Sequence, residues 1–188
     1  TAADRSYGKG GCMKRLTAKE VIELLDLEPL EGEGGFFRFL HACTDGQGLR
    51  SAGTIWYLVT DDSYSSLHWL PTDEIWYHCL GDPLDQLLLA PDGTFQRRRI
   101  GTDLAAKQLP VSVVPGRWWQ GTKLAAAGGY DDPEDGDEAD RACAENRRFG
   151  YALCCTMMSP PYDAATYRQG TIDLLVQYPG CPAIKDFL

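Results

Sequence analysis

The chain has 188 residues and a formal net charge of −9, with 44% hydrophobic and 24% charged residues. This length and composition suit one folded, soluble domain rather than a disordered chain. The negative charge opposes binding to nucleic-acid phosphates, and no segment approaches the ~20 apolar residues that span a bilayer. We therefore expect a protein that neither binds nucleic acid nor crosses a membrane.

Residues 1–16 are rich in glycine and basic side chains and predict an extended N-terminal arm. Because the first residue is Thr1 rather than Met, we expect that a leader has been removed, which leaves the compartment open between the cytoplasm and an organelle. Residues 17–28 predict one short helix, since Thr17 and Glu20 have capping-box spacing and apolar residues follow at helical intervals.

After this helix, short runs rich in β-branched and aromatic residues alternate with turn signals of Gly, Pro and Asp. Many such runs with little helix between them are typical of a β-sandwich or β-barrel. We therefore predict an all-β fold. The runs cover residues 35–42, 51–60, 65–70, 74–80, 84–90, 94–100, 109–114 and 151–158.

A strongly acidic segment interrupts the rhythm of the strands. Eight acids and three arginines lie between Asp131 and Arg148, so more than half of the net charge is here. Such a segment cannot enter a core, and we predict an acidic loop insertion at 128–148, serving either as a tolerated surface insertion or as a contact for cations or partners. Residues 172–178 predict a helix on the outside of the barrel, followed by a C-terminal tail at 179–188.

The segment from Glu74 to His78 is the richest in chemistry-bearing side chains. Strand alternation places Glu74, Trp76 and His78 on one face. If this face is the barrel interior, an acid, an indole and an imidazole share an apolar cavity, where pKa values shift and ligands bind. The alternative is a buried structural network in which Glu74 pairs with Arg38.

Other residues are candidate ligand contacts near this strand. Glu33 and Arg38 flank a Gly-Gly pair and are placed either to clamp a polar ligand at the barrel mouth or to form a surface ion pair. Trp76 and Trp119 are suited to stacking on a sugar ring, or to ordinary packing. The sequence has no phosphate-binding, dinucleotide-binding or serine-hydrolase motif, and its seven cysteines include no CxxC pair.

These motifs resemble a known family. The spacing of His68, Glu74 and Gly81 resembles the first cupin motif. The segments DEIWYHCLGDPL, LLLAPDG, IGTDLAAKQLP and VVPGRWWQ resemble segments of the cupin_5 (DUF985) family and follow one another in the same order. The resemblance implies a double-stranded β-helix, or jelly-roll barrel, over residues 17–178. Its architecture is similar to that of sugar epimerases of the RmlC-like class.

The sequence departs from metal-binding cupins at two positions. In those proteins the first motif supplies two histidines and a glutamate, and the second motif supplies a third histidine. Here Leu70 stands at the second histidine position and Gln120 at the third. Leucine cannot ligate and glutamine ligates weakly, so we expect no bound metal and no other cofactor.

The resemblance implies metal-free acid–base chemistry, with His68 transferring the proton, Glu74 orienting it and Tyr57 as the opposing acid. We expect a small polar ligand in the cavity, contacted also by His78 and Gln120. The leading hypothesis is an isomerase or epimerase of a carbohydrate-like molecule, working as a homodimer or with a protein partner. Two alternatives stay open: a non-catalytic accessory or scaffold subunit of a larger assembly, and a metal-dependent oxygenase or lyase.

Overall fold

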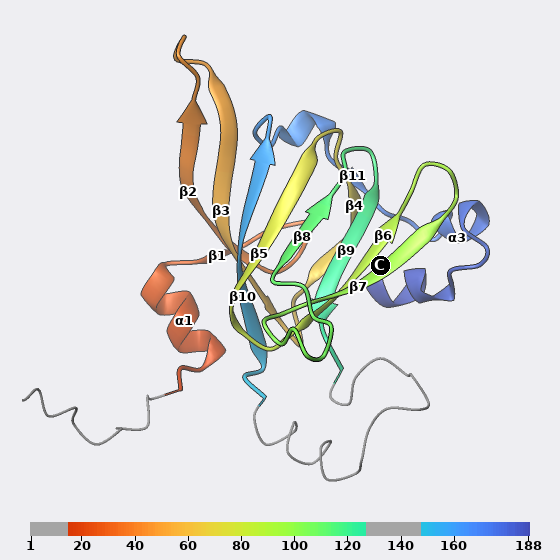
Figure 1. The fold of residues 1–188 in the computed structure, drawn as a ribbon, viewed down its shortest axis with the longest axis horizontal. Coiled ribbons are helices and arrows are strands. Elements are labelled where there is room, and N and C mark those ends of the chain that lie inside the picture. Colours follow the sequence, from red (N-terminus) through yellow and green to blue (C-terminus); the bar gives the residue numbers. More distant parts are fainter. Residues whose placement is uncertain (1–14, 127–147) are drawn as a thin grey trace, which may run out of the picture.

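The computed structural model describes residues 15–126 and 148–188, and the chain folds into two antiparallel sheets that enclose a barrel (Figure 1). The predicted all-β jelly roll with one short N-terminal helix is confirmed. Most of the predicted N-terminal arm and acidic loop lies outside the described residues. The first sheet has the order β1 (Glu28–Pro29), β2 (Phe36–Thr44), β3 (Arg50–Thr60), β10 (Tyr151–Ser159), β5 (Asp73–Gly81) and β8 (Val111–Val114).

The second sheet closes the other side of the barrel, and short helical elements flank both sheets. No helix in the described ranges is long and apolar enough to cross a bilayer. The second sheet has the order β11 (Arg168–Gln169), β4 (Ser65–Trp69), β9 (Trp119–Leu124), β6 (Leu84–Leu89) and β7 (Phe95–Ile100). The helical elements are α1 (Ala18–Leu25), η1 (Ala164–Thr166), α3 (Leu174–Gln177) and η2 (Pro182–Phe187).

Helix α1 begins where the capping box predicts. The Glu20 backbone N–H donates to Thr17 Oγ1 at 3.3 Å, and the Thr17 N–H donates to Glu20 Oε2 at 2.8 Å, so two end groups of the helix are satisfied reciprocally. The apolar side of α1 buries Val21 against Leu58 and Leu153 on the outer face of β3 and β10. The helix therefore covers one part of the barrel wall.

The C-terminal segment covers the outer face of the second sheet. Strand β6 is buried at all six positions, because its inner face meets the barrel core and its outer face meets α3 and η2. Phe187 is seated on Gly121, where even a Cβ would lie 3.0 Å from the Phe187 ring. The buried apolar residues between this segment and the second sheet form the C-terminal cluster, which comprises Leu67, Leu87, Leu89, Leu174, Tyr178, Cys181, Ile184 and Phe187.

One end of the barrel interior is filled by side chains from both sheets, including Val59, Leu84, Leu88 and Val114, with Trp76 among them.

Pairing in the β2–β3 hairpin and between β5 and β10 is interrupted by three bulges. Leu40, Ser51 and Cys79 are the extra residues, since their neighbours pair and they do not. Each extra residue changes which face the following side chains occupy.

Candidate functional site

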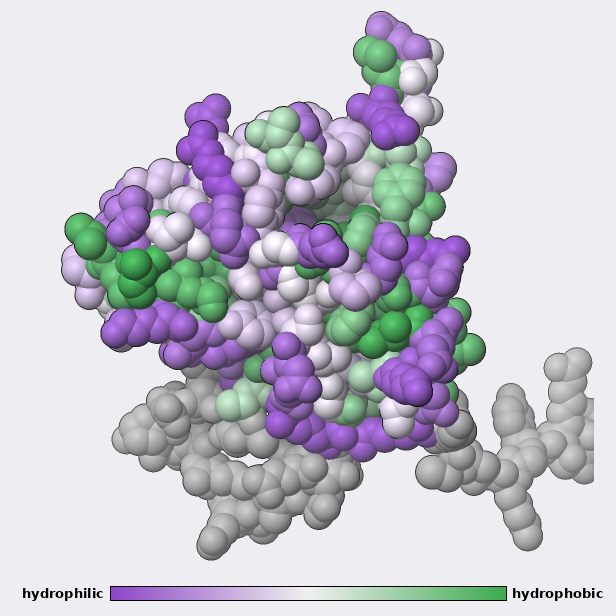
Figure 2. Space-filling view, turned by 180° about the vertical axis from the view of Figure 1, so that it is seen from behind, coloured by the Kyte–Doolittle hydropathy of each residue, from purple (hydrophilic) through white to green (hydrophobic). Residues whose placement is uncertain are grey.

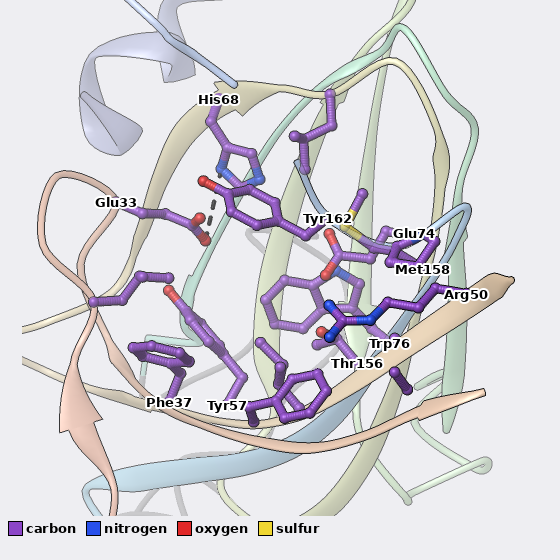
Figure 3. A pocket seen from close by; sticks show the side chains of 17 residues that line it. Glu33, Phe37, Arg50, Tyr57, His68, Glu74, Trp76, Thr156, Met158 and Tyr162 are labelled. Carbon is purple, nitrogen blue, oxygen red and sulfur yellow. Dashed lines mark ion pairs between the residues drawn. The ribbon is translucent and has the colours of Figure 1, made fainter. Parts of the chain in front are cut away.

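A cavity of about 330 Å³ opens between the two sheets, beside the filled end of the barrel (Figure 3). Its walls are mostly apolar, with aromatic and aliphatic side chains from β2, β3 and β10 such as Phe37, Ile55 and Met158. The polar side chains that border it are Glu33, Arg50, Tyr57, His68, Glu74, Thr156 and Tyr162. A cavity of this size, with few polar groups on apolar walls, is typical of a small-molecule site.

His68, on β4, is 1% exposed, and its ring is held on two sides. Its Nδ1 lies 2.8 Å from the backbone carbonyl oxygen of Ser66 and 3.8 Å from Glu33 Oε1, and its ring stacks on Tyr167. A carbonyl oxygen only accepts, so Nδ1 carries the proton in the neutral imidazole. Nε2 is then the free lone pair, and no hydrogen bond to it occurs within the described residues.

Glu74, on β5, is buried, and its carboxyl group is hydrogen-bonded to a side chain of the second sheet. Gln120 Nε2 donates to Glu74 Oε2 at 2.6 Å, and Trp76 Nε1 donates to Gln120 Oε1 at 3.2 Å. Burial raises the pKa of Glu74, and the nearby Glu33 raises it further, while His68 and hydrogen bonds from Gln120 and Thr156 act in the opposite direction. Glu74 therefore keeps its proton to a higher pH than an exposed glutamate.

Tyr57, on β3, borders the same cavity next to Trp76. Its hydroxyl donates to the backbone carbonyl of Gly34 at 2.7 Å, and its ring meets Trp76 edge-on at 5.4 Å between centroids. Burial, and then the charge of Glu33, hold the pKa of Tyr57 well above its usual value. The phenol therefore stays protonated, with its proton directed at Gly34.

A model of the family described as Cupin_5, Cupin superfamily (DUF985), matches residues 19–169. The chain belongs to the Cupin_5 family. This cupin is similar to a hypothetical protein from Leishmania major, at 27% identity and a TM-score of 0.71, over 92% of this chain and 98% of that chain. A Shewanella oneidensis protein with an X-ray structure is 25% identical, with a TM-score of 0.72, over 92% and 97% of the two chains. No curated protein matches the chain.

The positions that hold metal in other cupins do not fit a transition metal in this cupin. Leu70 borders the cavity with a side chain that cannot ligate. The amide of Gln120 is committed to Glu74 and Trp76, which leaves His68 and Glu74 as donors. Within residues 15–126 and 148–188, no group of three or more His, Cys, Asp or Glu side chains is arranged to hold a metal ion.

Arg38 lies outside the cavity. Its neighbours Phe37 and Phe39 border the cavity, so strand alternation turns Arg38 to the outer face. There its guanidinium donates to the Leu25 carbonyl at 2.9 Å and pairs with Asp26 at 3.3 Å, at the end of α1.

His78 and Trp119 also lie away from the cavity lining. His78 is two residues beyond Trp76, whose ring belongs to the filled part of the barrel, and its Nε2 bonds the Asp82 carbonyl at 2.9 Å. Trp119 precedes the inward-facing Gln120, so it faces outward and packs against the C-terminal cluster. The structure thus brings Glu33, Tyr57, His68, Glu74 and Trp76 to one cavity, with Gln120 behind Glu74.

Arg50 and Tyr162 border the cavity but carry no motif in the sequence. Alternation counted from Tyr57 along β3 would turn Arg50 outward, and only the bulge at Ser51 reverses it. Tyr162 comes from the loop after β10, whose path strand periodicity does not predict. The sequence therefore held no signal for either residue.

Proposed function

We propose that this cupin binds a small carbohydrate-like molecule in its barrel cavity and catalyses a metal-independent isomerisation or epimerisation of it. The observation that carries the proposal is the free Nε2 of a buried histidine in a cavity that also contains a buried carboxyl group of raised pKa. An accessible lone pair that can accept a proton and a nearby acid that keeps its own are the two groups that general acid–base catalysis requires.

His68 is the proposed base. Its Nε2 removes a proton from a carbon next to a carbonyl group, while Nδ1–H stays bonded to Ser66. The carboxylate of Glu33, 3.8 Å from Nδ1, favours the imidazolium that forms, as the buried acid does in a catalytic triad. Glu33 is itself held by Ser65, whose hydroxyl donates to it at 2.9 Å.

Glu74 is the proposed acid. In its protonated form it donates to the carbonyl oxygen as the carbon loses its proton, which gives a neutral enediol. Isomerisation is completed when His68 returns its proton to the adjacent carbon and Glu74 recovers a proton from the hydroxyl there. Epimerisation instead requires a second acid on the opposite face of the ligand. Tyr57, on the same cavity, is the candidate, and its hydroxyl must first turn from the Gly34 carbonyl to the ligand.

Solvent-exchange experiments test this function. Monosaccharides, keto sugars and sugar acids would be screened for binding by ligand-observed NMR, and each bound compound incubated with the protein in D₂O and EDTA. We expect deuterium at the carbon next to the carbonyl, detected by mass spectrometry, and no incorporation with His68→Asn. His41→Asn is the matched control, since His41 is an exposed histidine outside the cavity lining. Binding without exchange in the unmodified protein would contradict the isomerase function.

One observation favours the expected self-association of the chain. The outer face of β5 and β8 exposes Tyr77 at 37%, Val111 at 45% and Val113 at 46%, and Tyr77 pairs directly with Val111. Contiguous exposed apolar residues are typical of contact surfaces. We propose a second copy of this chain as the partner at this face.

A further inference from the structure

Among the residues that the structure describes, Arg50 is the one lysine or arginine that borders the cavity. Figure 3 shows its guanidinium directed into the cavity from β3. We propose that the ligand carries a carboxylate or phosphate group and that Arg50 binds this group at the cavity mouth. This inference rests on the proposed function, because it specifies which carbohydrate-like molecules the same cavity accepts.

The backbone aims Arg50 at the cavity. Along β3 the inward residues are Gly53, Ile55 and Tyr57, so an uninterrupted strand would turn Arg50 outward. Thr44 pairs with Arg50 and Cys43 pairs with Ala52, which leaves Ser51 as an extra residue between them. Such a bulge re-aims the side chains that follow it and is common beside functional sites.

Arg50 is free to bind a ligand. The nearest acid in the hairpin, Asp45, uses its carboxylate on the hairpin's own backbone, accepting from the N–H groups of Gln47 at 2.8 Å and Leu49 at 2.9 Å. Among the described residues, the Arg50 guanidinium takes part in no ion pair or side-chain hydrogen bond. A cation without a partner beside a cavity leaves its donors available for an anion.

The distribution of charge in the cavity fixes where the anionic group lies. Glu33 borders the cavity beside His68, where its carboxylate would repel an anion and where hydroxyl groups find an acceptor. Apolar side chains such as Phe39 line much of the rest of the cavity. A low-polarity wall strengthens an ion pair at its edge, and the planar guanidinium matches both carboxylate and phosphate. The anionic group therefore lies beside Arg50 and the reacting carbons lie nearer His68.

The test compares two anionic sugars, D-glucuronate and D-glucose 6-phosphate, with a neutral one, methyl D-glucoside. Binding to the full chain is titrated by ligand-observed NMR at constant ionic strength. We expect at least one anion to bind about tenfold or more tightly than the glucoside. The two anions distinguish a carboxylate site from a phosphate site. Arg50→Met should abolish the advantage, Arg50→Lys should retain part of it, and Lys185→Met, an exposed charge on η2, should change nothing.

Equal binding of the glucoside and both anions would overturn the inference while leaving the proposed function intact. The same holds if Arg50→Met, folded by its thermal transition, keeps the advantage of the anions. If none of the three probes binds at millimolar concentration, both the inference and the carbohydrate-like ligand of the proposed function are wrong.

Discussion

Gln120 and Glu74 are joined inside the barrel by a hydrogen bond of 2.6 Å from the amide Nε2 to the carboxyl Oε2. By resemblance to metal-binding cupins, these are the positions of the third histidine and of the glutamate. Here the two side chains bind each other, and Trp76 adds a further bond to the same amide. The arrangement therefore fixes the Glu74 carboxyl group from the neighbouring sheet.

We predict that purified protein contains well below one transition metal per chain by elemental analysis, because Leu70 and Gln120 supply no strong ligand. The double variant Leu70→His, Gln120→His restores the usual donor set and should raise the bound metal towards one per chain. Near-stoichiometric metal in the unmodified protein, lost on His68→Ala, would show that the prediction is wrong.

The raised pKa of Glu74 makes stability depend on pH. Its folded-state pKa lies above the ordinary carboxyl value of 4.5, so the native state binds more protons than the unfolded state between those two values. The contribution of Glu74 is therefore fully present below pH 4.5 and is lost as pH rises through the folded-state pKa. Urea unfolding should show a decrease in the free energy of unfolding over this pH range, and Glu74→Gln should remove that decrease. Glu31→Gln, at an exposed glutamate, should keep it, and an unchanged pH profile in Glu74→Gln would contradict the assignment.

The sequence predicts the fold and part of the site because these depend on local periodicity. Alternation places Glu74 and Trp76 inward, and the cupin spacing brings His68 to the same cavity. The first is a property of regular strands, and the second is what the resemblance to the cupin family implies. The capping box likewise marks the start of α1, because it involves residues only three apart.

The remaining part of the site depends on features that periodicity does not encode. The bulge at Ser51 turns Arg50 inward, and neither serine nor arginine is a residue type that predicts a bulge. His78 has the same alternation as Glu74 but lies beyond Trp76, and the distance along a strand does not reveal where packing ends a cavity. Trp119 and Gln120 are adjacent, so strand geometry itself allows only one of them to face inward.

Phe187 should be a main anchor of the C-terminal segment. Its ring is buried against Gly121 and Leu67, on the outer face of the second sheet. Phe187→Ala would leave a cavity there and should lower the free energy of unfolding by about 3 kcal/mol. Val176→Ala is the control, because the Val176 side chain is 82% exposed. Figure 2 shows hydrophobic residues on the surface at the end of the molecule where α3 lies. Equal, small losses in both variants would mean that the segment contributes little.

Self-association through strands outside the cavity stays a prediction. The exposed face of β5 and β8 offers Val113 for contact with a second copy. We expect a dimer at micromolar concentration by sedimentation, and Val113→Glu should shift it to monomer because a buried, unpaired carboxylate is costly. Leu104→Glu, at an exposed position elsewhere, should leave the dimer unchanged. A monomeric unmodified protein would exclude this association.

The last prediction separates a ligand site from a buried structural network. His68 and Glu74 are both buried and hydrogen-bonded, so burial alone does not distinguish the two roles. A structural network loses stability when one member is removed, because its partner is left unsatisfied. A binding residue loses affinity, because the ligand loses its contact.

We expect His68→Ala and Glu74→Gln to weaken binding of a sugar found in the NMR screen by about tenfold or more, which corresponds to about 1.4 kcal/mol. The free energy of unfolding, from urea titration without ligand, should fall by less than this. Gln120→Leu is the informative comparison, since Gln120 holds Glu74 from behind without bordering the cavity, and it should affect stability more than binding. Equal losses of binding and stability in the His68 and Glu74 variants would instead assign these residues to the core, and place the function of this cupin on its outer surface.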